Sequence, residues 1–255
     1  SLLYIAVAIA VFMNVGSYWF SDKLVVKMAG AQPADERAYS ELHNIVENLA
    51  ITAGLPKPRI YIINDPAPNA FATGRNAEHA VVAVTTGLLG MMERSELEGV
   101  LAHELSHIGN RDMLVATVAV VLVGFVTIIS DFAFRGMLFG GGDRDNKNNP
   151  IVAIIAVAFI ILAPIVAMLL QLAVSRKREF LADASGALLT RYPEGLANAL
   201  RKIGGYAAPM KRANNATAHL YISNPFGARA SMSGLARLFM THPPVEDRIK
   251  ALLGR

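Results

Sequence analysis

Three long apolar runs constrain the fold of this chain more than any other feature. Each is close to the roughly 20 consecutive apolar residues that a membrane-spanning helix needs. The last two flank a short polar loop, as in a helical hairpin that crosses a bilayer twice. The runs are Leu2–Phe20, Met113–Ser130 and Ile151–Val174. We therefore predict three transmembrane helices in contact with a lipid bilayer; the alternative is a set of buried helices in a large soluble core.

The composition agrees with this interpretation and excludes several functions. Apolar residues make up 53% of the 255 residues and charged residues 17%, which is more apolar than an average soluble protein. The net charge of +4 is modest, and no cluster of Lys and Arg is interleaved with aromatic residues, so we expect no nucleic-acid partner. The absence of Cys excludes disulfides, thiolate metal ligands and cysteine nucleophiles. Because Ser1 begins the chain inside an apolar run, we expect a processed or trimmed N-terminus.

The stretch between the first two apolar runs carries the signals of a small α+β unit. We predict an amphipathic helix over Pro33–Ala53, ended by Gly54 and Pro56. Ser95 and Glu98 have the spacing of a capping box and predict the start of another helix. Three short apolar segments bounded by turn residues predict strands. These strands are expected at Arg59–Ile63, Ala70–Thr73 and Ala80–Val84.

The predicted helix after Ser95 carries an H-E-x-x-H pattern, formed by His103, Glu104 and His107. Residues four apart lie on one face of a helix, so both imidazoles can bind one metal ion. Glu104 lies about 100° around the helix from His103 and faces a water on the metal rather than the metal. Zinc lowers the pKa of such a water toward about 7, so a carboxylate can remove its proton. A helix with ordinary surface histidines is the alternative for the pattern taken alone.

A third ligand is available directly after the last apolar run. Glu179 completes a His₂Glu set and leaves the fourth zinc position open, as a catalytic zinc requires. Asp183 lies four residues later on the same helical face and is expected to accept the far N–H of one metal-binding histidine. The alternative is a solvated Glu179 that pairs with Arg176 or Lys177. We therefore predict one Zn²⁺ per chain at a hydrolytic site.

These patterns divide the chain into four parts. We expect a transmembrane helix, a first catalytic part with the strands and the H-E-x-x-H helix, a transmembrane hairpin, and a second catalytic part with Glu179, a covering segment and a C-terminal helix after Pro244. Lys and Arg favour the catalytic side of the spans, which places that side in the cytoplasm. Because both arms of the site end close to apolar runs, membrane proteins are the expected substrates. The four parts cover residues 1–22, 23–112, 113–174 and 175–255.

Five segments, which follow one another in the expected order, resemble the HtpX family of membrane zinc metalloproteases, relatives of the CAAX prenyl proteases. They are Asn69–Gly74, His103–Asp112, Ser175–Asp183, Ala218–Pro225 and Thr241–Ile249. The resemblance covers nearly the whole chain. One difference is that members of this family usually carry a further N-terminal span, which is missing here.

The resemblance implies a gluzincin-type metalloprotease fold, α+β and mostly α, with a small β-sheet and transmembrane helices. It implies that His103, His107 and Glu179 are the zinc ligands and that Glu104 is the general base. It also places His242 and Arg248 near the metal, where either stabilises the oxyanion. It implies a substrate strand that adds to an edge of the sheet; the residues of this edge are Asn69, Ala70, Phe71 and Ala72.

The resemblance further implies proteolytic quality control of misfolded or unfolded membrane proteins, as part of a stress response, at the inner (plasma) membrane. Two rival functions stay open at this point. One is a non-enzymatic membrane scaffold with a relic site, against which the intact Glu104 argues. The other is a prenyl-protein protease, a function that usually requires a larger chamber of helices. Nothing in the sequence sets the number of subunits.

Overall fold

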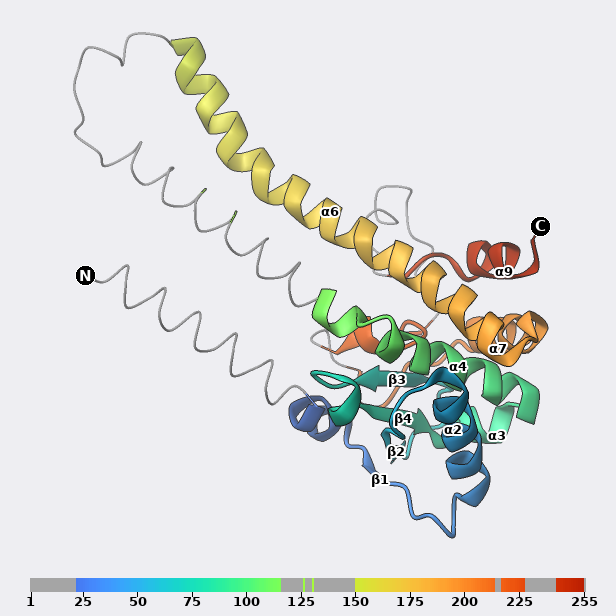
Figure 1. Cartoon of the computed structure of the whole chain (residues 1–255). Helices are drawn as coiled ribbons and strands as arrows, with labels where there is room; N and C mark the ends of the chain where they lie inside the picture. Colours follow the sequence, from blue (N-terminus) through green and yellow to red (C-terminus); the bar gives the residue numbers. More distant parts are fainter. Residues whose placement is uncertain are drawn as a thin grey trace.

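The structure is a computed structural model that describes residues 22–115, 126, 130, 150–213, 217–227 and 242–254. It has a small mixed sheet with helices packed against it (Figure 1), in agreement with the predicted α+β class. The first predicted span, Leu2–Phe20, lies outside the described residues, as does Met113–Ser130 apart from 113–115, 126 and 130. The third, Ile151–Val174, falls within a long helix. Across the described residues, no helix combines the length and apolar character that crossing a membrane requires.

The sheet has the strand order β1-β2-β4-β3. Its central pair, β2 (Arg59–Ile63) and β4 (Val81–Thr85), is parallel, with Arg59 opposite Val81. The strand β3 (Ala70–Thr73) runs antiparallel to β4 and forms one edge of the sheet. The short β1 (Gln32–Pro33) forms the other edge. The three predicted strands are thus confirmed, with β4 shifted by one residue.

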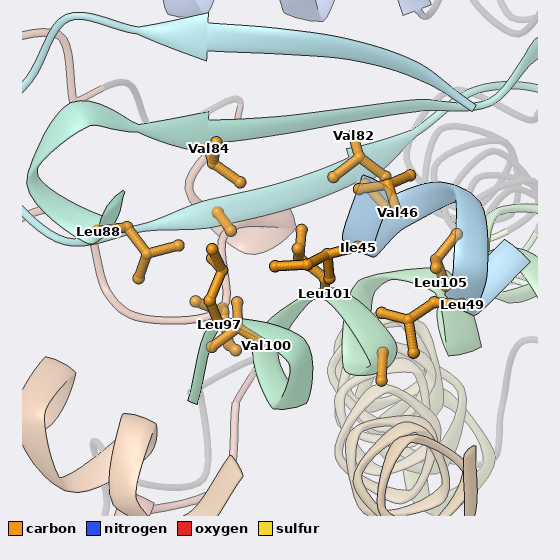
Figure 2. Packing of buried hydrophobic residues seen from close by; sticks show 14 of the residues in the cluster. Ile45, Val46, Leu49, Val82, Val84, Leu88, Leu97, Val100, Leu101 and Leu105 are labelled. Atoms are coloured by element: carbon orange, nitrogen blue, oxygen red, sulfur yellow. The ribbon is translucent and has the colours of Figure 1, made fainter. Parts of the chain in front are cut away.

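The main core lies between one face of this sheet and the helices α2 (Ser40–Ala53) and α4 (Arg94–Gly109). Because side chains alternate along a strand, β2 and β4 each send one set of residues to this core and the other set to a smaller cluster around Phe71. Figure 2 shows how side chains of α2, β4 and α4 meet in the main core. Those labelled there are Ile45, Val46, Leu49, Val82, Val84, Leu88, Leu97, Val100, Leu101 and Leu105.

The predicted starts of both helices need correction. The helix α2 begins at Ser40 rather than near Pro33, because Pro33 pairs with β2 and the Asp35 side chain accepts backbone hydrogen bonds in a turn that follows. The capping box of α4 is formed by Glu93 and Glu96, two residues before the predicted one. The backbone N–H of Glu93 donates to Glu96 at 2.8 Å, and Lys202 from another helix holds the same carboxylate at 2.6 Å. This buried ion pair is a tertiary contact and selects the earlier cap.

Three further helices enclose α4 on the side away from the sheet. The long α6 (Pro150–Thr190) continues from the third apolar run into the segment that carries Glu179 (Figure 1). The helices α7 (Pro193–Gly204) and α9 (Val245–Leu253) complete this layer. The short elements α3 (Thr86–Met91), η1 (Ala77–His79) and η3 (Ala218–Leu220) connect the larger ones.

Two glycines let α4 approach its neighbours with backbone against backbone. A Cβ atom on Gly186 of α6 would lie 2.9 Å from the backbone nitrogen of His103. A Cβ atom on Gly99 of α4 would lie 2.6 Å from the backbone nitrogen of Leu196 in α7. Both distances are shorter than real Cβ contacts, so only glycine fits these two positions without a shift of a helix.

We expect Gly186→Ala to destabilise the protein by about 1–3 kcal/mol, the usual cost of overpacking, because the added methyl group pushes α6 away from His103. Equilibrium unfolding by denaturant measures the change. Gly90→Ala is the matched control, since nothing lies within 4 Å of its Cβ position and Ala favours a helix over Gly. Wild-type stability of Gly186→Ala would contradict the tight contact between α4 and α6.

Candidate metal centre

The helix α4 presents both histidines of the H-E-x-x-H pattern on one face. The rings of His103 and His107 lie nearly perpendicular, with centroids 4.6 Å apart. Their Nε2 atoms face one another at 3.1 Å. Two ligands that bind one zinc ion at about 2.0–2.1 Å each in a tetrahedral arrangement lie about 3.3 Å apart. The spacing therefore suits two ligands of a single ion.

The helix α6 supplies the third group. Glu179 is buried, and its carboxylate oxygens lie 3.8 Å from His103 Nε2 and 3.5 Å from His107 Nε2. One ligand atom from each of the three residues lies within 4.8 Å of the other two. The structure thus brings together the three residues that the sequence predicts as metal ligands, although Glu179 lies more than 70 positions along the chain from the histidines.

Carboxylates hold the far sides of both imidazoles. His103 Nδ1 lies 2.9 Å from Asp183 Oδ1, and His107 Nδ1 lies 2.6 Å from Asp112 Oδ2. Because an Nδ1 that faces a carboxylate carries the proton, each Nε2 turns a lone pair toward the common centre. Two lone pairs that converge in this way require a cation between them.

The electrostatics of His107 point to the same demand for a cation. Burial lowers the pKa of His107, but the hydrogen bond to Asp112 and the attraction of Glu179 and Glu104 outweigh it and raise the pKa to about 9. A proton shared between the two Nε2 atoms satisfies this demand, and so does a metal ion. The donors present, two imidazoles and one carboxylate, are those of catalytic zinc sites. The residues therefore fit a bound metal ion.

Glu104 lies beside this group as a buried carboxylate, 1% exposed. Among the described residues, neither of its oxygens has a hydrogen-bond partner. Burial raises the pKa of Glu104 to about 7, although the nearby His107 acts in the opposite direction. A buried carboxylate without a partner is costly, and it is the arrangement that a general base needs when its partner is a water or a substrate.

His242 and Arg248 lie at the site, where the resemblance places them, but they differ in what they contact. His242 Nδ1 lies 3.0 Å from Glu179 Oε2, without the geometry of a hydrogen bond. Burial raises the pKa of Glu179, but the attraction of His242 and both other histidines outweighs it and holds the pKa well below its usual value. Glu179 is therefore ionised, as a metal ligand must be.

The guanidinium of Arg248 is fully engaged by its neighbours. This residue is 1% exposed, and it donates two hydrogen bonds to the Asp183 carboxylate, at 2.8 Å and 2.6 Å. It also donates to the backbone oxygen of Ile222 at 3.2 Å and lies 3.4 Å from the His103 ring. Arg248 thus holds Asp183, which in turn holds His103.

The predicted substrate strand is an edge strand, but part of its outer edge is already paired. The backbone N–H of Ile222 donates to the Ala70 oxygen at 2.9 Å, and Phe71 forms an antiparallel bridge with Tyr221. The Asn69 side chain donates to the Ser223 oxygen at 3.0 Å and is buried. Asn69 therefore holds the neighbouring segment against β3 rather than facing solvent.

Two residues of the site lie inside the motifs quoted from the sequence without a role assigned to them there. Asp112 follows the H-E-x-x-H helix and contacts His107. Arg178 directly precedes Glu179 and contacts Asp112. A carboxylate shortly after the second histidine was the signal that could have identified Asp112, since metal-binding histidines usually donate their other N–H to such a group.

Comparisons with known proteins agree with this geometry. The model of peptidase family M48 matches residues 36–255. A protease HtpX homolog from Caldanaerobacter subterraneus subsp. tengcongensis is 48% identical over 98% of this chain and 83% of its own length. A protease HtpX homolog from Pyrococcus furiosus is 51% identical over 98% of this chain and 85% of its own length.

A solved structure has a similar fold. The crystal structure of S. mikatae Ste24p matches with a TM-score of 0.63 at 20% identity, and the match covers 98% of this chain and 58% of that chain. At this identity the likeness concerns the fold alone. The family match extends over both halves of the metal centre, from α4 to α9. The chain therefore belongs to peptidase family M48, as a metalloprotease of the HtpX type.

Proposed function

We propose that this protein is a zinc-dependent endopeptidase of the membrane that hydrolyses peptide bonds in misfolded or damaged membrane proteins. One observation carries the catalytic part of the proposal. Two imidazole nitrogens and the Glu179 carboxylate converge within 4.8 Å, beside the buried and unpartnered carboxylate of Glu104. A purely structural metal site has no need of such a carboxylate, which argues against a scaffold with a relic site.

In this proposal His103, His107 and Glu179 hold one zinc ion per chain. Imidazole and carboxylate donors suit zinc, and a set of three leaves the further position that catalysis needs. When bound, the metal supplies Lewis-acid chemistry that polarises the peptide carbonyl and acidifies water. Asp183, held by Arg248, and Asp112 keep the two imidazoles in the tautomer that ligation requires.

The protein's own groups carry the proton transfers. Glu104 accepts a proton from the attacking water and then donates it to the amine that leaves, which is the usual task of a general base with a pKa near neutrality. His242 is the donor that we assign to the oxyanion, because neither of its ring nitrogens has a hydrogen-bond partner among the described residues. Arg248 is bound to Asp183 and supports the site through that carboxylate.

The substrate is expected to bind as an extended chain along β3. Main-chain hydrogen bonds to an edge strand provide affinity with little dependence on sequence, which suits a protease of many substrates. The strand β3 packs against α4, the helix that carries Glu104, so an added strand lies next to the catalytic carboxylate. The backbone oxygen of Ala70 is already bonded to Ile222, which leaves the Ala72 end of β3 for the substrate.

The membrane part of the proposal rests on the apolar runs of the sequence and on the course of α6. This helix is continuous from the predicted span to the metal centre. Val174 and Glu179 are separated by about 7–8 Å of helix. We therefore propose that the site lies at the cytoplasmic face of the inner membrane and acts in stress-related quality control, on bonds in or close to membrane segments.

Reconstituted protein in vesicles tests this function. We expect a membrane-anchored reporter with a cytoplasmic flanking segment to be cleaved at least about 10-fold faster than casein, because orientation at the membrane raises the effective concentration of the flanking segment. Cleavage of both substrates must be absent in Glu104→Gln and after metal removal. Faster cleavage of casein would contradict membrane substrates, and no cleavage by the wild-type protein would contradict the protease function.

A further inference from the structure

Asp112 and Arg178 form a second support for the metal centre, on the side opposite to Asp183. Asp112 Oδ2 lies 2.6 Å from His107 Nδ1. The other oxygen of Asp112 accepts hydrogen bonds from the guanidinium of Arg178. Arg178 also donates to the backbone oxygen of Asn110, just beyond the end of α4. The order of contacts is thus arginine, aspartate, histidine.

The same order of contacts exists at the other histidine. Arg248 binds Asp183, and Asp183 binds His103 Nδ1. Each imidazole is therefore held from behind by a carboxylate, and each carboxylate is fixed by an arginine. The two chains come from different elements, because Arg248 belongs to α9 and Arg178 to α6.

The local backbone is shaped for this contact. The helix α4 ends at Gly109, and Arg111 adopts a positive φ of 56°, a conformation that is unfavourable for a residue with a side chain. This turn brings Asp112 back toward His107, five residues earlier in the chain. Asp112 contacts the Nδ1 atom, on the side of the ring away from Glu179, so it is placed to support the ligand and not to bind the metal.

We propose that Asp112 and Arg178 are positioning residues that fix the tautomer and orientation of His107 and set its distance from Glu179. The proposal rests on the metal site of the proposed function. Arg178 immediately precedes Glu179 on α6, so one ion pair links the end of the helix that carries two ligands to the residue next to the third. The side chains are only 11% and 25% exposed, which limits the screening that weakens surface ion pairs.

Metal affinity of the full-length protein, measured by competition with a chelator, tests this role. We expect Asp112→Asn to lower the affinity for Zn²⁺ about 10–100-fold, the usual effect of removing the group that supports a metal-binding histidine. We expect Arg178→Lys to have a smaller effect in the same direction, because Lys keeps the charge but loses the two-pronged contact. The Co²⁺-substituted protein reports the geometry directly, since its visible spectrum shifts when a ligand turns.

The thermal unfolding of the metal-free protein separates positioning from general stability. Glu47→Gln, which removes the surface partner of Lys57, is the matched control and should keep wild-type metal affinity. Wild-type affinity and an unchanged Co²⁺ spectrum in Asp112→Asn would overturn the proposal. If Asp112→Asn does not fold, Arg178→Lys decides in the same way. Absence of metal from the wild-type protein would instead refute the proposed function.

Discussion

Replacement of Glu104 by Gln is expected to lower kcat/KM about 10²–10⁴-fold while the protein keeps its metal. Glutamine has nearly the same shape as glutamate but cannot accept the proton of the attacking water, and general base catalysis contributes about this factor. The three groups proposed as metal ligands are untouched, because Glu104 lies beside His103, His107 and Glu179 without being one of them. Single-turnover cleavage of the reporter and metal analysis of the same sample measure both quantities.

The control for this variant is Glu98→Gln, on the same helix. Glu98 pairs with Arg94 near the surface, one and a half turns from the site, so its loss should leave cleavage and metal content unchanged. Removing the buried charge of Glu104, whose burial raises its pKa to about 7, should not destabilise the fold. Cleavage at the wild-type rate by Glu104→Gln would refute its role as base.

Replacement of Glu179 by Ala is expected to remove both the metal and the activity. The loss of affinity should exceed the about 10–100-fold typical of a residue that only supports a ligand, and cleavage should fall with metal occupancy. The variant also leaves His242 and Arg248 without the carboxylate that lies 3.0 Å and 3.6 Å from them, so some destabilisation is expected. Metal analysis, cleavage and unfolding of the same preparation distinguish these effects.

Glu194→Ala provides the comparison, since Glu194 is an exposed carboxylate of α7. It should retain metal, activity and stability. Normal metal content in Glu179→Ala would show that a different group completes the site. The pair Glu104→Gln and Glu179→Ala therefore separates the chemistry of the base from the binding of the metal.

Local patterns in the sequence were sufficient for the strands and for the existence of the main helices. The segments at Arg59–Ile63 and Ala70–Thr73 are strands because apolar residues lie between strong turn signals there. The starts of α2 and α4 were wrong, because tertiary contacts select them. Pro33 is paired in the sheet, and Glu96 is held by Lys202, which is distant in sequence.

The metal ligands were predictable because their chemistry fixes their spacing. Two imidazoles four residues apart on a helix leave few choices for a third donor, and Glu179 was the suitable carboxylate. The partners of the supporting residues were not predictable from spacing. Arg248 was assigned to the oxyanion and is instead bound to Asp183, and Asn69 was assigned to the substrate and instead holds Ser223.

The two glycine contacts of α4 bear on how this protease is controlled. With Gly99 against α7 and Gly186 against α6, and the sheet on its third side, the helix that carries His103 and His107 has no space in which to slide or rotate. A ligand set mounted on so rigid a support stays assembled whether or not a polypeptide is present. Restraint of the enzyme must therefore act on the entry of substrates, at the β3 edge that Ile222 already closes in part.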